Sequence, residues 1–105
     1  YAKKIKKEES KIDWNMSADK LIAKINGLNP SPGAWFEHKS NRIKIVEAVK
    51  VNLNGKIGEV LDQSLVVGCK QQSIRILQIQ REGKKTLKTS DFLKGYEILK
   101  GEFLN

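Results

Sequence analysis

The stretch RIKIVEAVKV at residues 42–51 decides the fold of this chain. Apolar and polar side chains largely alternate along it and many are β-branched, which is typical of a strand with one buried face. Similar stretches follow at residues 57–61, 65–69 and 74–80, with short polar segments between them. The sequence therefore predicts four or five antiparallel strands joined by tight turns.

The apolar phase within residues 74–80 changes between Ile76 and Leu77. A strand accommodates such a change with an extra residue or a bend, so we expect a bulge or a strand that curves around a barrel. The strands, with one helix in front of them, indicate a mainly β (α+β) domain. We expect a small antiparallel β-barrel of the oligonucleotide-binding (OB) type, preceded by one amphipathic helix.

That helix is predicted over residues 17–27. Ser17 suits the N-cap, and Gly27 with Pro30 ends the element. Its apolar side chains recur at helical spacing and are expected in the core, namely Leu21, Ile22, Ile25 and Leu28. Near the C-terminus, a single helical turn capped by Ser90–Asp91 is expected.

Two tryptophans flank the predicted helix. Trp14 precedes it, and Trp35 follows the segment at residues 29–34 that holds both prolines. We expect both indoles to anchor local structure to the core, because each lies beside turn and helix signals rather than within a strand pattern. Stacking of these rings on nucleic-acid bases is the alternative.

Length and composition limit the chain to one domain of 105 residues. Its single cysteine, Cys69, excludes an internal disulfide and is expected to be a small buried apolar residue. No run of about 18 apolar residues is present, and the first residues are too charged for a signal peptide. We therefore expect a cytoplasmic protein without a membrane partner. The start at Tyr1 rather than Met suggests a piece of a longer protein.

The charge balance favours polyanionic partners. The 20 Lys and Arg residues exceed the 12 Asp and Glu residues and give a formal net charge of +8 at pH 7. Lysine dominates, since arginine occurs only at positions 42, 75 and 81. This composition predicts point-charge contacts with phosphates rather than bidentate reading of bases. A solvated basic surface without a specific partner is the alternative.

Residue types needed for catalysis are scarce. His38 is the single histidine, and its polar surroundings at residues 37–41 predict a surface position in a turn. One histidine and one cysteine do not make a transition-metal site, and the sequence has no nucleophile elbow or phosphate-cradling glycine loop. Carboxylates that are close in sequence, such as Glu59 and Asp62, lie in turns or among lysines. We therefore expect no catalytic, cofactor-binding or metal-binding residue in this chain.

Several stretches resemble parts of one known domain. These are the helix end and proline loop at residues 25–35, two strands at residues 42–45 and 58–60, the stretch at 79–85, and the closing turn at 91–95. They resemble the C-terminal domain of methionyl-tRNA formyltransferase, and the first residues resemble the end of that family's interdomain linker. The likeness extends over nearly the whole chain.

Three positions depart from the usual pattern of that family. Asn26 stands where the family usually has arginine, Ser31 where it has tryptophan, and Ile57 where it has proline. The chain therefore lacks one cation and one aromatic ring of the family, while the barrel pattern is intact. Folate-dependent enzymes that formylate amino-sugar nucleotides carry a related domain, but the net charge of +8 favours tRNA over such small substrates.

The resemblance implies a two-domain enzyme of which this chain is the accessory part. In the family, an N-terminal catalytic domain holding an Asn, a His and an Asp transfers a formyl group from 10-formyltetrahydrofolate to initiator methionyl-tRNA in translation initiation. Residues 1–12 would be a basic interdomain arm, and residues 13–105 the C-terminal barrel domain. We expect the chain itself to be a non-catalytic monomer that binds tRNA and positions it electrostatically.

Two lysine-rich segments, the arm and the loop around Gly83, are predicted to contact phosphates. The predicted nucleic-acid-binding residues are Lys3, Lys4, Lys6, Lys7, Lys11, Lys84, Lys85 and Lys88. An ordinary polar hairpin turn is the alternative reading of residues 83–85. Two other functions are open, a structural module that packs against its partner domain and a generic OB-fold binder of single strands.

Overall fold

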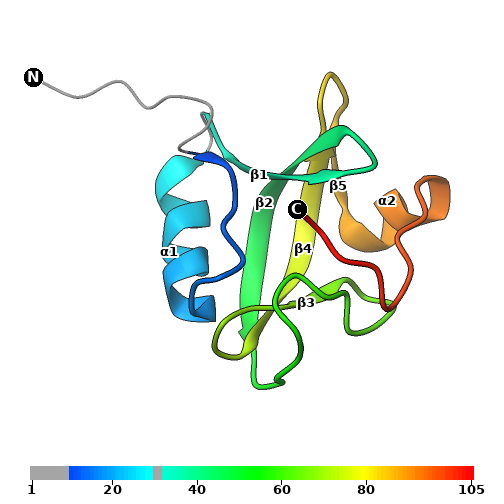
Figure 1. Cartoon of the computed structure of the whole chain (residues 1–105). Helices are drawn as coiled ribbons and strands as arrows, with labels where there is room; N and C mark the ends of the chain where they lie inside the picture. The colour runs from blue at the N-terminus through cyan, green and yellow to red at the C-terminus, as the bar shows by residue number, and fades with distance from the viewer. Residues whose placement is uncertain (1–9, 30–31) are drawn as a thin grey trace, which may run out of the picture.

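A computed structural model describes residues 10–29 and 32–105, and it shows a curled antiparallel sheet with a helix at each side (Figure 1). The elements, in chain order, are α1 (Ala18–Leu28), β1 (Ala34–His38), β2 (Asn41–Val51), β3 (Val66–Gly68), β4 (Ser73–Arg81), β5 (Thr86–Lys88) and α2 (Thr89–Gly95).

The sheet is a half-barrel with β2 and β4 at its centre. Its strand order is β1-β2-β4-β3, and β5 pairs with β4 beyond β3, so that β3 and β5 share one edge of β4. Helix α1 packs mainly against β2, whereas α2 packs against β4 and β5 (Figure 1). The expected antiparallel barrel-like fold with a preceding amphipathic helix is confirmed.

The predicted irregularity in the fourth stretch is also confirmed. Ile45 pairs with Ile79 and Ala48 pairs with Ile76, and the register between β2 and β4 shifts between these two pairs. Leu77 has no partner in this register, which lets Ile76 and Ile79 both turn into the core. The change of apolar phase in the sequence thus marks the place where the sheet bends.

The helix and the sheet enclose one apolar core. Ser17 caps α1 by accepting a hydrogen bond from the backbone N–H of Lys20, as predicted. Trp14 is 5% exposed, and its ring packs against Phe36 with centroids 6.0 Å apart. The largest fully buried side chains are Phe36, Leu21, Ile25, Ile43, Ile45, Leu65, Ile74, Ile76, Ile79, Val60, Val66 and Val67.

Residues 57–61 do not form the predicted strand. Gly58 has a φ of +80°, which breaks the extended backbone, and the neighbouring Glu59 and Val60 form only isolated bridges with Phe103 and Val67. A Cβ at position 58 would also lie 3.0 Å from the carbonyl oxygen of Leu104. The segment is therefore not a strand of the sheet, and its backbone path depends on the glycine at position 58.

Strand β1 was not predicted, because its hairpin lacks the usual turn residues. Lys39 and Ser40 connect β1 to β2 with φ values of 49° and 67°, the two positive values that a type I′ turn requires. Asn-Gly or Asp-Gly normally indicates such a turn. Trp35 therefore lies in a strand rather than in the loop expected from the sequence.

The predicted surface position of His38 is wrong, because the side chain is buried and 4% exposed. Its Nδ1 hydrogen-bonds with the Tyr96 hydroxyl at 2.9 Å, and its Nε2 donates to the Glu102 carboxylate at 2.9 Å. The Tyr96 hydroxyl also accepts a hydrogen bond from the Asn41 amide at 3.0 Å. These bonds satisfy the buried imidazole and join the end of β1 to the C-terminal segment.

Glu102 gives this network a dependence on pH. Hydrogen bonds from the backbone N–H of Leu99 and from His38 hold the pKa of the Glu102 carboxyl below its ordinary value of 4.5. Because the folded pKa is lowered, the stabilisation is present above pH 4.5 and is lost as the pH falls through the folded value. We expect Glu102→Gln to lower the free energy of unfolding by about 1 kcal/mol at pH 7. Urea unfolding should show this difference shrinking at acid pH, and a difference independent of pH would contradict the assignment.

The remaining sequence predictions differ in detail. Helix α2 begins at Thr89, so Ser90 and Asp91 lie in its first turn, and its N-cap Lys88 makes no side-chain capping bond. Cys69 is buried, as expected, and burial raises the pKa of its thiol to about 11. A thiol with this pKa stays protonated at neutral pH and is a poor nucleophile.

Candidate nucleic-acid interface

Two cationic side chains lie over the ring of Trp35 on one side of the sheet. The Trp35 Nε1 donates a hydrogen bond to the Ser10 hydroxyl at 3.0 Å, which fixes the ring against the segment before α1. The Arg42 guanidinium lies over the ring, 4.4 Å from its centroid, and the Lys11 ammonium lies 5.6 Å from it. Attraction to the ring face holds these two cations in place and reduces the side-chain entropy that Arg42 loses on binding a ligand.

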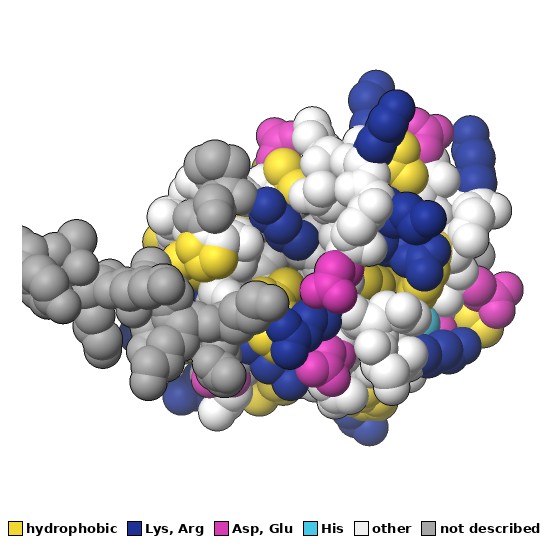
Figure 2. Space-filling view, turned by 90° about the horizontal axis from the view of Figure 1, so that it is seen from above, with side chains coloured by type: hydrophobic (Ala, Val, Ile, Leu, Met, Phe, Trp, Pro, Cys, Tyr) yellow, Lys and Arg dark blue, Asp and Glu magenta, His cyan; other side chains and the backbone are white. Residues whose placement is uncertain are grey.

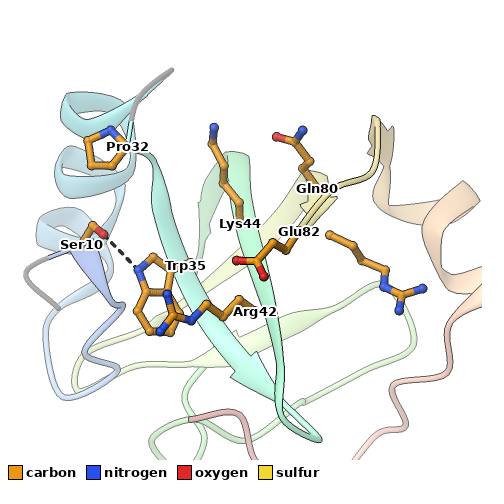
Figure 3. A pocket seen from close by; sticks show the side chains of 9 residues that line it. Ser10, Pro32, Trp35, Arg42, Lys44, Gln80 and Glu82 are labelled. Carbon is orange, nitrogen blue, oxygen red and sulfur yellow. Dashed lines mark hydrogen bonds between the residues drawn. The ribbon is translucent and has the colours of Figure 1, made fainter. Parts of the chain in front are cut away.

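A groove of about 250 Å³ opens beside this indole. Figure 3 shows Trp35 and Arg42 together at one side of it, with Lys44, Gln80 and Glu82 projecting from β2 and the end of β4. Pro32, which follows α1, completes the rim. Strands β1, β2 and β4 therefore bring a ring, two cations and two polar groups into one hollow.

Gly33 makes room for Lys44 in this groove. Its φ is +83°, and a Cβ at this position would lie 2.2 Å from Cε of Lys44. The backbone N–H of Gly33 donates to the carbonyl oxygen of Leu28 at 2.9 Å, which closes the end of α1. The glycine thus ends the helix and allows the half-buried lysine stem to pass.

A second arginine lies on an aromatic ring at the neighbouring strand. The Arg81 guanidinium is 4.9 Å from the centroid of Tyr96, and that ring stacks on Phe92 at 4.9 Å. Arg81 also lines a hollow of about 310 Å³ together with Lys84 and Lys85. Lys84 and Lys85 are exposed.

Pairing of β2 with β4 joins the two hollows. Ile43 lies opposite Arg81, and the backbone N–H of Glu82 donates to the carbonyl oxygen of Arg42 at 3.3 Å. A third, smaller hollow is lined by both arginines and Glu82. All three hollows share Arg81, which pairs with the buried Ile43 and so starts from the face of the sheet opposite to Trp35 and Lys44. We call the surface that runs around the end of β4 between these hollows the cationic face, and it comprises Lys11, Arg42, Lys44, Arg81, Lys84 and Lys85. Figure 2 views the molecule from the end that carries the β4–β5 turn and shows basic side chains spread over it, with carboxylates between them.

The predicted lysines fall into three groups. Lys11, Lys84 and Lys85 lie on the cationic face, so the end of the arm and the Gly83 loop border one surface. Lys88 lines a different hollow, next to Glu47 and Arg75. The arm lysines Lys3, Lys4, Lys6 and Lys7 lie outside the described residues.

Sequence reasoning missed both arginines of the cationic face. Arg42 and Arg81 are seven and fifteen positions away from the rings that hold them, and the strand pairing and the C-terminal segment bring them together. Trp14 is a core anchor, as predicted, whereas Trp35 is only half-buried. The alternation in residues 42–51 placed Arg42 and Lys44 on the polar face of their strand, but no local pattern linked Arg81 to Tyr96.

In the part of the chain that the structure describes, no three His, Cys, Asp or Glu side chains gather as metal ligands would. Neither helix among residues 10–29 and 32–105 is long and apolar enough to cross a membrane. The arrangement of cations on rings suits anionic, planar ligands.

Relatives of known name match almost the whole chain. A methionyl-tRNA formyltransferase from Pelagibacter ubique is 49% identical over 102 residues, which cover 96% of this chain and 33% of that protein. Another from Paramagnetospirillum magneticum is 42% identical over 104 residues, which cover 99% of this chain and 34% of the relative. The chain thus spans about a third of the length of these curated relatives.

Solved structures share the fold. HypX from Aquifex aeolicus, crystallised in complex with tetrahydrofolic acid, superposes with a TM-score of 0.69 and 23% identity over 97% of this chain and 21% of that one. A family model described as "Formyl transferase, C-terminal domain" matches residues 4–97. From this match, which agrees with the half-barrel and its two helices, we conclude that the chain belongs to the formyl transferase C-terminal domain family.

Proposed function

We propose that this chain is the tRNA-binding domain of a methionyl-tRNA formyltransferase. The observation that carries the proposal is the cationic face, where two arginines held on aromatic rings adjoin four lysines. Phosphates of a folded RNA would lie along this surface and be neutralised by point charges and guanidinium groups. The names of the relatives support tRNA as the RNA in question.

The domain would act by position rather than by chemistry. In the proposed whole enzyme, an N-terminal catalytic domain transfers the formyl group from 10-formyltetrahydrofolate to initiator methionyl-tRNA. The cationic face would hold the body of the tRNA while the acceptor end enters that domain. Phosphate contacts carry no base information, so discrimination of the initiator tRNA would fall mainly to the catalytic domain.

The salt dependence of tRNA binding tests the proposal. Six phosphate contacts predict that the logarithm of the binding constant falls by about 4–5 per tenfold rise in salt. Fluorescence anisotropy with initiator tRNA, between about 50 and 300 mM salt, would measure this slope. A competition experiment separates this function from that of a generic single-strand binder. If the chain were such a binder, a single-stranded oligonucleotide would displace labelled tRNA as effectively as unlabelled tRNA does. A slope near zero would contradict the proposal.

Exposed apolar side chains favour a second role. Leu99 and Phe103 are 54% and 53% exposed in the C-terminal segment, although neighbouring Ile98 and Leu104 are buried. Such residues are suited to packing against another domain. If this were the main role, deletion of the barrel from the full enzyme would lower its stability, whereas neutral substitutions on the cationic face would leave tRNA affinity unchanged.

A further inference from the structure

We infer that the groove beside Trp35 binds a single unpaired nucleotide of the RNA, with its base stacked on the Arg42 guanidinium. This inference rests on the proposed RNA-binding function and adds a local recognition element to it. The groove combines a planar group, a phosphate-binding cation and hydrogen-bond acceptors, which are the three components that a nucleotide requires.

Arg42 supplies the stacking surface. The central carbon of its planar guanidinium lies over the Trp35 ring, 4.4 Å from the ring centroid, and the arginine is exposed. In the inferred complex, the base would stack on the side of the guanidinium that is turned away from the indole. Unpaired RNA bases commonly stack on arginine planes as well as on aromatic rings. The base would thus extend a stack that already contains the indole and the guanidinium.

Polar groups for the base edge and the phosphate border the same groove. The Gln80 amide donates from Nε2 to the carbonyl oxygen of Lys84 at 2.8 Å, which leaves its Oε1 as the atom for a ligand. The exposed Glu82 carboxylate forms no ion pair within 4.0 Å in the described part of the chain. A carboxylate weakens a surface that binds only phosphates, but it accepts hydrogen bonds from the amino groups of bases. Lys44 would contact the phosphate.

The size of the groove matches one base rather than a stack of bases. Its volume of about 250 Å³ is below the range of roughly 300–1,000 Å³ that is usual for drug-sized ligands. Base pairs of an intact duplex keep their faces covered by neighbouring pairs and cannot reach the guanidinium. The groove therefore distinguishes RNA with an unpaired nucleotide from fully paired RNA.

Two RNA hairpins test this inference with the 105-residue chain. One carries a single 2-aminopurine bulge, and its control has a uridine opposite the 2-aminopurine so that the base is paired. Anisotropy should show that the bulged hairpin binds about tenfold more tightly, the effect of one stacked base. Arg42→Lys, which keeps the charge and removes the plane, should abolish this preference. Lys20→Gln, at the N-terminal end of α1 and away from the groove, should leave the preference for the bulged hairpin unchanged.

Each outcome distinguishes the inference from the proposed function. Equal affinities of the two hairpins for the unsubstituted chain, each falling with salt, would overturn the nucleotide groove and leave RNA binding intact. A preference that persists in Arg42→Lys would overturn the role of Arg42 as the stacking surface. If neither hairpin binds in a salt-dependent manner, both the inference and the proposed function are wrong.

Discussion

Replacing Arg42 and Arg81 together with glutamine should weaken the binding of tRNA by about 100-fold at moderate salt. Each arginine contributes a charge-assisted contact worth about 1.5 kcal/mol, and a tenfold change corresponds to about 1.4 kcal/mol. The slope of affinity against salt should also fall by about 2, one for each positive charge removed from the surface that faces the phosphates. Anisotropy titrations with initiator tRNA at several salt concentrations measure both quantities.

A matched double variant controls for net charge. The double variant Arg75→Gln with Lys20→Gln also removes two positive charges. However, Arg75 lines another hollow and Lys20 lies on α1. The control should retain affinity within about threefold, because long-range attraction is screened over about 10 Å at ordinary salt. Equal losses in the two double variants would show that only net charge matters, and the cationic face would lose its assigned role.

The substitution Phe36→Ala should lower the free energy of unfolding by about 3–5 kcal/mol. The Phe36 side chain is fully buried on β1, packs against Trp14 and contributes to the core between α1 and the sheet. A domain of this size is typically stable by only about 5–15 kcal/mol, so the variant should be largely destabilised. Urea denaturation followed by tryptophan fluorescence measures the change.

The exposed Leu87 provides the matched comparison. It is 42% exposed on β5, and Leu87→Ala should change the free energy of unfolding by less than about 0.5 kcal/mol. Because Trp35 neighbours Phe36 on the same strand, loss of β1 packing should also weaken tRNA binding. A loss below about 1 kcal/mol in Phe36→Ala would contradict the placement of β1 in the core.

Local patterns in the sequence predicted those parts of the fold that local physics determines. Ser17 caps α1, and the period of 3.6 in the following residues places Leu21 and Ile25 in the core. The change of phase after Ile76 marks the register shift between β2 and β4. In each case, a few residues that are close in sequence determine the structural feature.

The missed elements depend on contacts between distant residues or on unusual backbone conformations. The turn at Lys39 and Ser40 adopts positive φ without glycine or asparagine, so no turn signal revealed β1. His38 is buried because Tyr96 and Glu102, far along the chain, satisfy both ring nitrogens. The positions of Arg42 and Arg81 on aromatic rings could not be predicted, because contacts between distant parts of the chain place them beside Trp35 and Tyr96.

The most direct test of the cationic face is a two-dimensional ¹H–¹⁵N spectrum of the chain titrated with tRNA. The two indole N–H signals provide an internal comparison, since Trp35 lies on this face and Trp14 is buried in the core. We predict that the Trp35 indole and the Arg42 and Arg81 side-chain N–H signals shift, while the Trp14 indole signal does not. Shifts confined to α1, or an unchanged Trp35 signal at saturating tRNA, would contradict the account.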